Sequence, residues 1–102
     1  MQNILFKTSE PTAAKGPVEF YNISLNFQEI QGRRLNVVHE KHGWWSNETG
    51  TATFDDGFTS PPEVFDSFSE AVDRYCAIRT SRASEGFMHS FSWHFLTGKQ
   101  IA

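Results

Sequence analysis

One segment of this chain has the pattern of a long amphipathic helix, and the remaining elements must pack around it. With 100° of rotation per residue, most apolar residues of the segment 60–82 fall on one stripe, whereas Glu63, Asp66, Glu70, Asp73 and Arg74 fall on the far side. A helix of this kind buries its stripe against another layer of secondary structure. Phe68 lies at the centre of the stripe and is predicted to be a core residue. The stripe contains Val64, Phe65, Phe68, Ala71, Val72, Tyr75, Cys76 and Ile78.

Two capping boxes are candidates for the start of this helix. Residues 60–63 (SPPE) place prolines in the first turn, where a missing N–H costs nothing, and residues 67–70 (SFSE) form a second box. We favour the earlier start, because the stripe then includes Val64 and Phe65. If the later start is correct, these two residues form a short extended entry. Gly86 is a plausible stop signal.

The rest of the chain has the pattern of strands and turns. Residues 18–28 alternate between apolar and polar side chains, which indicates a strand with one wet face. A hairpin is predicted from a turn at 31–33 and a returning strand at 35–40. Trp44 and Trp45 extend this strand past Gly43. Residues 3–7 form either a short first strand or an apolar tail packed against the body. Strands are expected at 51–54, after a turn at 47–50, and at 87–96, where His89 is expected to be a core residue.

This order of elements predicts the α+β class. We expect an antiparallel or mixed four- to five-stranded sheet with one long helix packed on one face, in a single compact domain spanning residues 1–102. Phe87, Phe91, Trp93 and Phe95 are expected to face the helix. Val18, Phe20, Val38 and one of the tandem tryptophans are then left on the opposite face. Such leftover apolar surface predicts a partner, and we expect a homodimer.

Composition narrows the class of protein. The chain has 15 aromatic residues among 102 (10 Phe, 3 Trp and 2 Tyr), which is many for one small core. The net charge of −3 argues against nucleic-acid binding. A single cysteine, Cys76, excludes a disulfide within the chain, and we expect it to be a buried structural thiol. Because no apolar run is long enough to span a membrane and no signal peptide is evident, a cytoplasmic location is predicted.

Charge is distributed unevenly along the chain. No Lys or Arg occurs from His42 through Asp73, although this segment is rich in carboxylates. The simplest explanation is a solvated face that aids solubility. The functional interpretation is a docking face for a basic protein partner, with Trp44 or Trp45 as an aromatic anchor. The acidic residues expected on the outward helix face are Glu63, Asp66, Glu70 and Asp73.

Histidines are the other candidate functional groups. His39 and His94 lie in separate predicted strands, and either one is a candidate acid or base in a pocket. No spacing fixes a metal site, so neither a metal nor a cofactor is predicted. The chain contains none of the common nucleotide-binding or hydrolase motifs.

Two hypotheses for function follow. The first is a non-enzymatic protein-interaction module, such as an adaptor, an inhibitor or a mobile-element accessory protein. The alternative is a small dimeric ligand-binding protein or enzyme with an aromatic pocket and a histidine acid or base. The first needs a flat or convex acidic patch, whereas the second needs a cavity with convergent polar groups.

Overall fold

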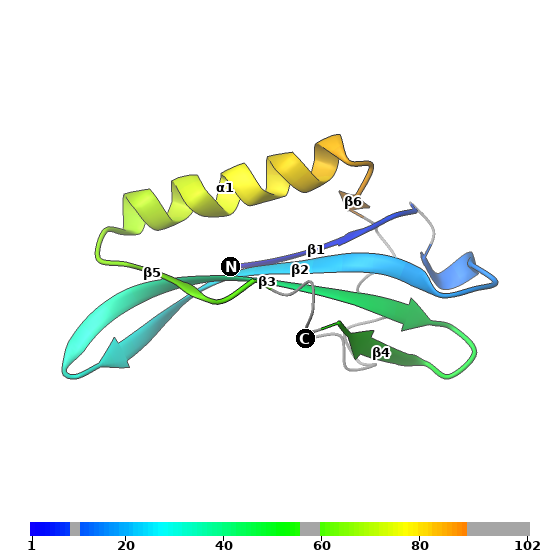
Figure 1. The fold of residues 1–102 in the computed structure, drawn as a ribbon, viewed down its shortest axis with the longest axis horizontal. Helices are drawn as coiled ribbons and strands as arrows, with labels where there is room; N and C mark the ends of the chain where they lie inside the picture. Colours follow the sequence, from blue (N-terminus) through cyan, green and yellow to red (C-terminus); the bar gives the residue numbers. More distant parts are fainter. Residues whose placement is uncertain (9–10, 56–59, 90–102) are drawn as a thin grey trace.

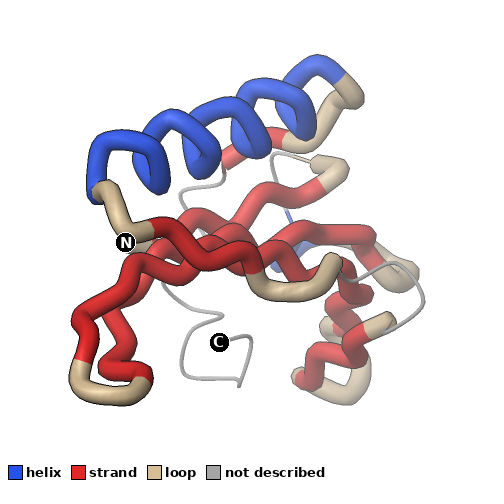
Figure 2. The backbone as a smooth tube through the Cα atoms, turned by 60° about the vertical axis from the view of Figure 1, so that its left-hand side comes forward, coloured by secondary structure: helices blue, strands red, loops and turns tan. Residues whose placement is uncertain are grey.

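The computed structural model describes residues 1–8, 11–55 and 60–89 as an antiparallel sheet with one helix across one face (Figures 1 and 2). The predicted α+β class is therefore confirmed. The strand order is β4-β3-β2-β1-β6, and β5 pairs with β3. The elements are β1 (Gln2–Phe6), the 3-10 helix η1 (Pro11–Ala13), β2 (Val18–Ile30), β3 (Arg33–Ser46), β4 (Thr51–Phe54), β5 (Glu63–Phe65), α1 (Phe68–Ser84) and β6 (Met88–His89).

The long hairpin of β2 and β3 forms the centre of the sheet. Its register runs from Val18 opposite Trp45 to Ile30 opposite Arg33. The connection has two residues, Gln31 and Gly32, with φ of 52° and 76°. A two-residue turn with positive φ at both positions matches the right-handed twist of the strands. The hairpin predicted from alternation is confirmed, including its extension past Gly43.

The helix begins at the later of the two capping boxes, so the earlier start favoured from the sequence is wrong. Ser67 is extended, with φ −90° and ψ 127°, and its hydroxyl accepts a hydrogen bond from the Glu70 N–H at 3.3 Å. The earlier box fails for a local reason: Pro62 disfavours the helical conformation of the preceding Pro61. Residues 63–65 form β5 instead, with Val64 opposite Val37.

The helix packs on the face of the sheet that carries the odd-numbered residues of β2. Tyr21, Ile23 and Leu25 are buried there, and Phe87 joins them as predicted. Val38 was expected on the opposite face, but it pairs with Leu25 and therefore points to the helix. The helix contributes its buried residues Ala71, Tyr75 and Ile78, with Val72 and Cys76 packed at the margin.

A second, smaller core covers one end of the opposite face. Phe20 lies between the rings of Phe6 and Phe54, with centroids 5.7 and 5.8 Å away. The Asn47 side-chain amide donates to the backbone carbonyl of Pro11 at 2.6 Å, which ties η1 to the turn after β3. This apolar surface, from which we expected a dimer, is therefore buried within the chain. Its buried members are Ile4, Phe6, Val18, Phe20 and Trp45.

Gly43 makes this second core possible. It lies in the middle of β3, opposite both Phe20 and Phe54. A Cβ atom at this position would lie 2.7 Å from the Thr53 carbonyl oxygen and 2.9 Å from Cζ of Phe20. Because a backbone atom blocks the space, only glycine fits here.

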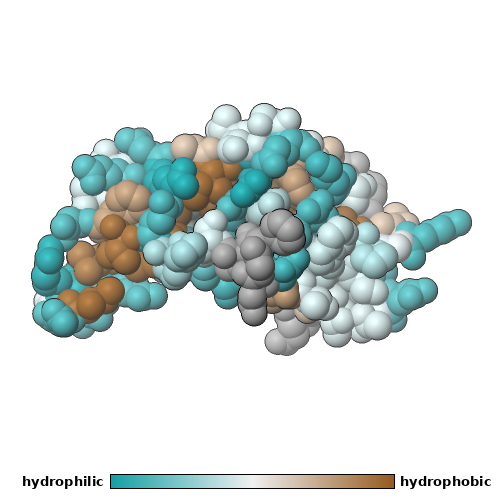
Figure 3. Space-filling model, in the orientation of Figure 1, coloured by the Kyte–Doolittle hydropathy of each residue, from teal (hydrophilic) through white to brown (hydrophobic). Residues whose placement is uncertain are grey.

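Phe68, expected at the centre of the core, is instead half exposed. It is the first residue of α1, and its ring stacks on Phe27 of the hairpin with centroids 6.0 Å apart. The expectation failed because it assumed a helix start about two turns earlier. Apolar side chains reach the surface at this hairpin end of the molecule (Figure 3). The exposed apolar residues at this end are Phe27 and Ile30 of the hairpin and Val64 and Phe68 of the helix entry.

The last predicted strand is only partly described. Met88 and His89 form β6 and pair with β1. His89 is exposed at this edge, so its expected burial in the core is wrong. Phe91, Trp93, Phe95 and His94 lie outside the described residues. Among residues 1–8, 11–55 and 60–89, no helix has the length and apolar character that crossing a membrane requires.

Candidate functional site

The tandem tryptophans point to opposite faces of the sheet, so only one of them lies at the surface. Trp45 is 2% exposed and belongs to the second core, where its indole N–H donates to Asn47 at 2.7 Å. Trp44 faces the helix side and is 42% exposed. Of the two anchors proposed from the sequence, Trp44 is therefore the one available to a partner.

The four carboxylates expected on one helix face do not share it. Glu63 lies in β5 and forms an ion pair with Arg74, with 2.7 Å between Oε2 and Nε. Asp66 precedes the helix and pairs with Arg33. Glu70 and Asp73 lie on α1 and are exposed. The expected acidic strip is therefore broken, because two of its members are outside the helix and paired with arginines.

β2 begins and β3 ends at the same end of the sheet, on the right side of Figure 1. A hollow of about 470 Å³ lies at this end, beside Trp44. Trp44 and Glu19 face each other directly across these two strands. Both residues line the hollow, so its wall contains an aromatic ring and a carboxylate from adjacent strands. The other lining residues are Lys7, Thr8, Ala13, Ala14, Pro17 and Val18.

The carboxylate of Glu19 is held from behind by a buried histidine. Nε2 of His42 lies 2.6 Å from Oε2 of Glu19, and the ionised carboxylate is an acceptor only, so the ring nitrogen donates. The His42 side chain is 5% exposed, against 30% for Glu19. Asp55 approaches the other ring nitrogen, with 4.0 Å between Oδ2 and Nδ1. The bond to His42 fixes the Glu19 carboxylate at the wall of the hollow.

Aromatic rings clamp the imidazole in place. The His42 ring lies 4.9 Å from the ring of Tyr21 and 5.9 Å from that of Trp44, between centroids. Burial raises the pKa of the Tyr21 phenol above its ordinary value of 10.0. A buried ring packed between two aromatics and bonded to a carboxylate has a positioning role, since a substrate cannot reach its Nε2.

Two cations near this end of the sheet, Arg82 and Lys7, have partners within the chain. Arg82 makes two hydrogen bonds to Glu40, at 2.6 and 2.9 Å, and its guanidinium lies 3.9 Å from the centre of the Tyr21 ring. The bonds to Glu40 raise the pKa of Arg82 above its ordinary value. Lys7 donates to the backbone carbonyl of Glu85 and lies over the ring of Phe87.

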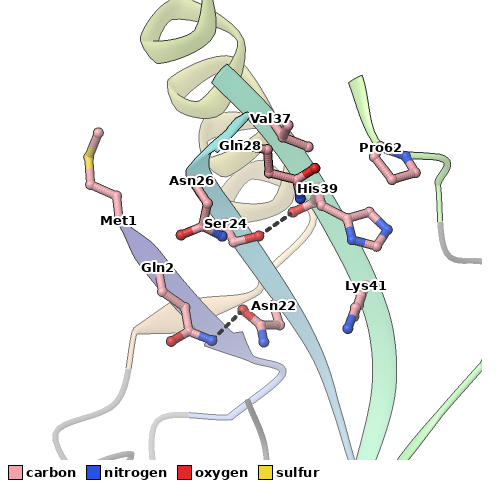
Figure 4. Close-up of a pocket in the computed structure, with 10 residues that line it drawn as sticks. All are labelled: Met1, Gln2, Asn22, Ser24, Asn26, Gln28, Val37, His39, Lys41 and Pro62. Atoms are coloured by element: carbon pink, nitrogen blue, oxygen red, sulfur yellow. Dashed lines mark hydrogen bonds between the residues drawn. The ribbon is translucent and has the colours of Figure 1, made fainter. Parts of the chain in front are cut away.

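The histidine pocket expected from the sequence takes a different form. His39 lines a hollow of about 520 Å³ on the face away from the helix, but its described lining is rich in amides and contains no Phe, Tyr or Trp (Figure 4). His94 lies outside the described residues. Within the described part of the chain, no three histidine, cysteine or acidic side chains come together as a metal site.

Sequence reasoning missed Glu19 and its bond to His42. One signal was present: Glu19 falls on the same face of its strand as Tyr21 and Ile23, where a charge is unexpected. The contact with His42 could not be predicted from the sequence, because the register that brings His42 to this face is fixed only by the hairpin turn.

Comparisons of the chain with protein-family models, with curated proteins and with solved structures give no match.

Proposed function

We propose that this protein is a non-enzymatic interaction module that takes a basic side chain of a protein partner into the hollow between Trp44 and Glu19. The observation that carries the proposal is the direct pairing of an exposed indole with a carboxylate held in place by a buried histidine. An aromatic face attracts a cation, and a fixed carboxylate receives its N–H groups. Arginine satisfies both at once, because its guanidinium is planar and carries several donors.

Two features favour binding over catalysis. The described lining of the hollow contains one carboxylate, one lysine and one hydroxyl residue among mainly apolar residues, with no nucleophile beside a base. The histidine behind Glu19 is buried among aromatic rings and bonded to that carboxylate. The hollow therefore has recognition groups without the arrangement that acyl or phosphoryl transfer needs.

The proposal keeps the basic partner expected from the sequence and moves its docking point. Glu63 and Asp66 support the fold through their arginine partners, whereas Glu70 and Asp73 remain on the helix as a solvated, weakly steering charge. The aromatic anchor is Trp44. One arginine side chain held by a cation–π contact and a charge-assisted hydrogen bond binds on the order of millimolar or more weakly, so a partner must add further contacts.

The test uses isotope-labelled protein and a pair of small probes. Acetyl-arginine amide is expected to shift the indole N–H resonance of Trp44 in a saturable way, and the isosteric neutral acetyl-citrulline amide is expected to leave it in place. The shift should disappear in Glu19→Gln and weaken as salt is added. An equal response to both probes, or an unchanged response in Glu19→Gln, would overturn the proposal.

The homodimer expected from the sequence stays a proposal, now on a different surface. Phe27 and Phe68 stack on each other at the hairpin end, and each is 50% exposed. A second copy of the chain would bury this exposed aromatic pair in a dimer interface. Light scattering at micromolar concentration should give about twice the 11.6 kDa chain mass, and Phe27→Ser should restore the single-chain value. A single-chain mass for the unmodified protein would exclude the dimer.

A further inference from the structure

The face of the sheet opposite the helix is divided into two halves of different character. One half is the second core around Phe20 and Trp45. The other half is a hollow of about 520 Å³ whose described lining comes from Met1, β1, β2 and β3, with Pro62 at one edge (Figure 4). This volume falls within the range of small-molecule sites, roughly 300–1,000 Å³.

Strand register places the polar side chains of this half in rows. Gln2, Ser24 and His39 share one row across the three strands, because Ser24 pairs with both of the others. Asn22 and Lys41 form the next row. Figure 4 shows these side chains projecting from the same side of the sheet, with the helix behind them. The full polar lining is Gln2, Asn22, Ser24, Asn26, Gln28, His39 and Lys41.

An outward-facing polar surface is ordinary for an antiparallel sheet with one covered face. This one differs because it is hollowed and partly preorganised. Asn22, at its floor, is only 6% exposed, and its Oδ1 accepts a hydrogen bond from Nε2 of Gln2 at 3.1 Å. The Ser24 hydroxyl donates to the His39 carbonyl at 3.4 Å. A ligand would therefore meet polar groups whose positions are already restricted, which lowers the ordering cost of binding.

Charge and hydrogen-bonding chemistry define the ligand. The chain has a net charge of −3, yet none of the described residues lining this hollow is acidic, and Lys41 supplies a positive charge. The four amide side chains carry both donors and acceptors, and those that the Gln2–Asn22 bond does not use match neighbouring hydroxyl groups. An ammonium on the same wall matches one anionic group of the ligand.

We propose that this hollow binds a monosaccharide-sized polyhydroxylated molecule that carries one anionic group, either a phosphate or a carboxylate. Lys41 binds the anion, while Asn22, Asn26 and Gln28 bind the hydroxyl groups. His39 lies in the row between those of Lys41 and Asn26, and its ring nitrogen supplies a further polar group. The site is on the opposite face of the sheet from Trp44 and Glu19, so it is independent of the proposed partner-binding hollow.

Calorimetric titration with four probes tests the site. Glucose 6-phosphate and gluconate represent the two sources of negative charge, glucose carries the hydroxyl groups alone, and inorganic phosphate carries the anion alone. At least one of the two charged sugars should bind more than about tenfold more tightly than glucose and than phosphate, since one charge-assisted hydrogen bond contributes about that factor. The charged sugar that binds more tightly identifies the anionic group.

Variants identify where the probe binds. Lys41→Met should weaken binding of the charged sugar about tenfold and leave binding of glucose unchanged. Asn26→Asp should also weaken binding of the charged sugar, because it places a like charge in the hollow. Lys15→Met, in the exposed loop before β2, is the matched control and should have no effect. Thermal unfolding of each variant checks that the fold persists. The proposal would be overturned if neither charged sugar binds, or if the charged sugars bind no more tightly than inorganic phosphate. It would also be overturned if Lys41→Met binds the charged sugar as tightly as the unmodified protein does.

Discussion

The buried ion pair between Glu40 and Arg82 gives the sharpest prediction about stability. The Glu40 side chain is 5% exposed, and that of Arg82 is 23% exposed. The pair links the last turn of α1 to the middle of β3 through two hydrogen bonds of 2.6 and 2.9 Å. Replacing Arg82 with Met removes the guanidinium and leaves a carboxylate buried without its cation. Breaking one side of a buried pair costs about 3–5 kcal/mol.

This loss is a large part of the stability of a chain of this size, which is about 5–15 kcal/mol. The assay is urea unfolding at neutral pH, with the midpoint and the slope fitted together. Glu85→Gln is the matched control, because Glu85 contacts the same guanidinium at the surface, where a pair contributes under about 1 kcal/mol. The double change Glu40→Leu with Arg82→Met should recover much of the loss, since no charge is left buried. An Arg82→Met loss equal to that of Glu85→Gln would refute the reasoning.

Three further predictions concern the core. Gly43→Ala should lose about 1–3 kcal/mol of stability in urea unfolding, because its Cβ meets a backbone oxygen at 2.7 Å, whereas Gly16→Ala, with open space around it, should change little. Phe68→Ala should lower the free energy of unfolding by only about 1 kcal/mol, because half of the Phe68 surface is already exposed to solvent. Ile78→Ala should lower it by about 2–5 kcal/mol, because Ile78 is buried. Equal losses would place Phe68 in the core. Burial raises the pKa of both tyrosines, Tyr21 and Tyr75, above 10.0. The contribution of these neutral phenols to the free energy of unfolding should therefore be fully present below about pH 10 and fall as the pH rises through the raised pKa values. Tyrosinate absorbance should therefore titrate later in the folded than in the urea-unfolded protein, and coincident curves would contradict this.

Local patterns in the sequence were sufficient to predict the fold class and most of its strands. Period-two alternation in β2 and the polar turn at Gln31 and Gly32 gave the hairpin, and these signals involve neighbouring residues only. The helix start was misplaced because both capping boxes satisfy the same capping rule and the bias of Pro62 against a helical Pro61 was given too little weight. The choice also depends on Val64 pairing with Val37, a contact 27 residues apart that periodicity does not contain.

The candidate site was less predictable for the same reason. Trp44 was proposed as an anchor, but which tryptophan is exposed depends on strand parity within a register that the turn sets. The pairs that disperse the acidic strip, Arg33 with Asp66 and Arg74 with Glu63, join separate elements. The Glu19–His42 contact likewise joins two strands. Tertiary contacts of this kind arise from packing, which one sequence without its register does not specify.

The central claim is that the hollow at Trp44 and Glu19, rather than the acids of the helix, receives a basic partner. The most direct test is the dissociation constant of a fluorescent arginine-containing peptide, measured by anisotropy at low salt against its citrulline counterpart. Trp44→Ala and Glu19→Gln should each weaken the arginine peptide by about tenfold, and Glu70→Gln with Asp73→Asn should change it by less than about twofold. The opposite order, with binding lost in the helix variant and retained in the other two, would contradict the claim.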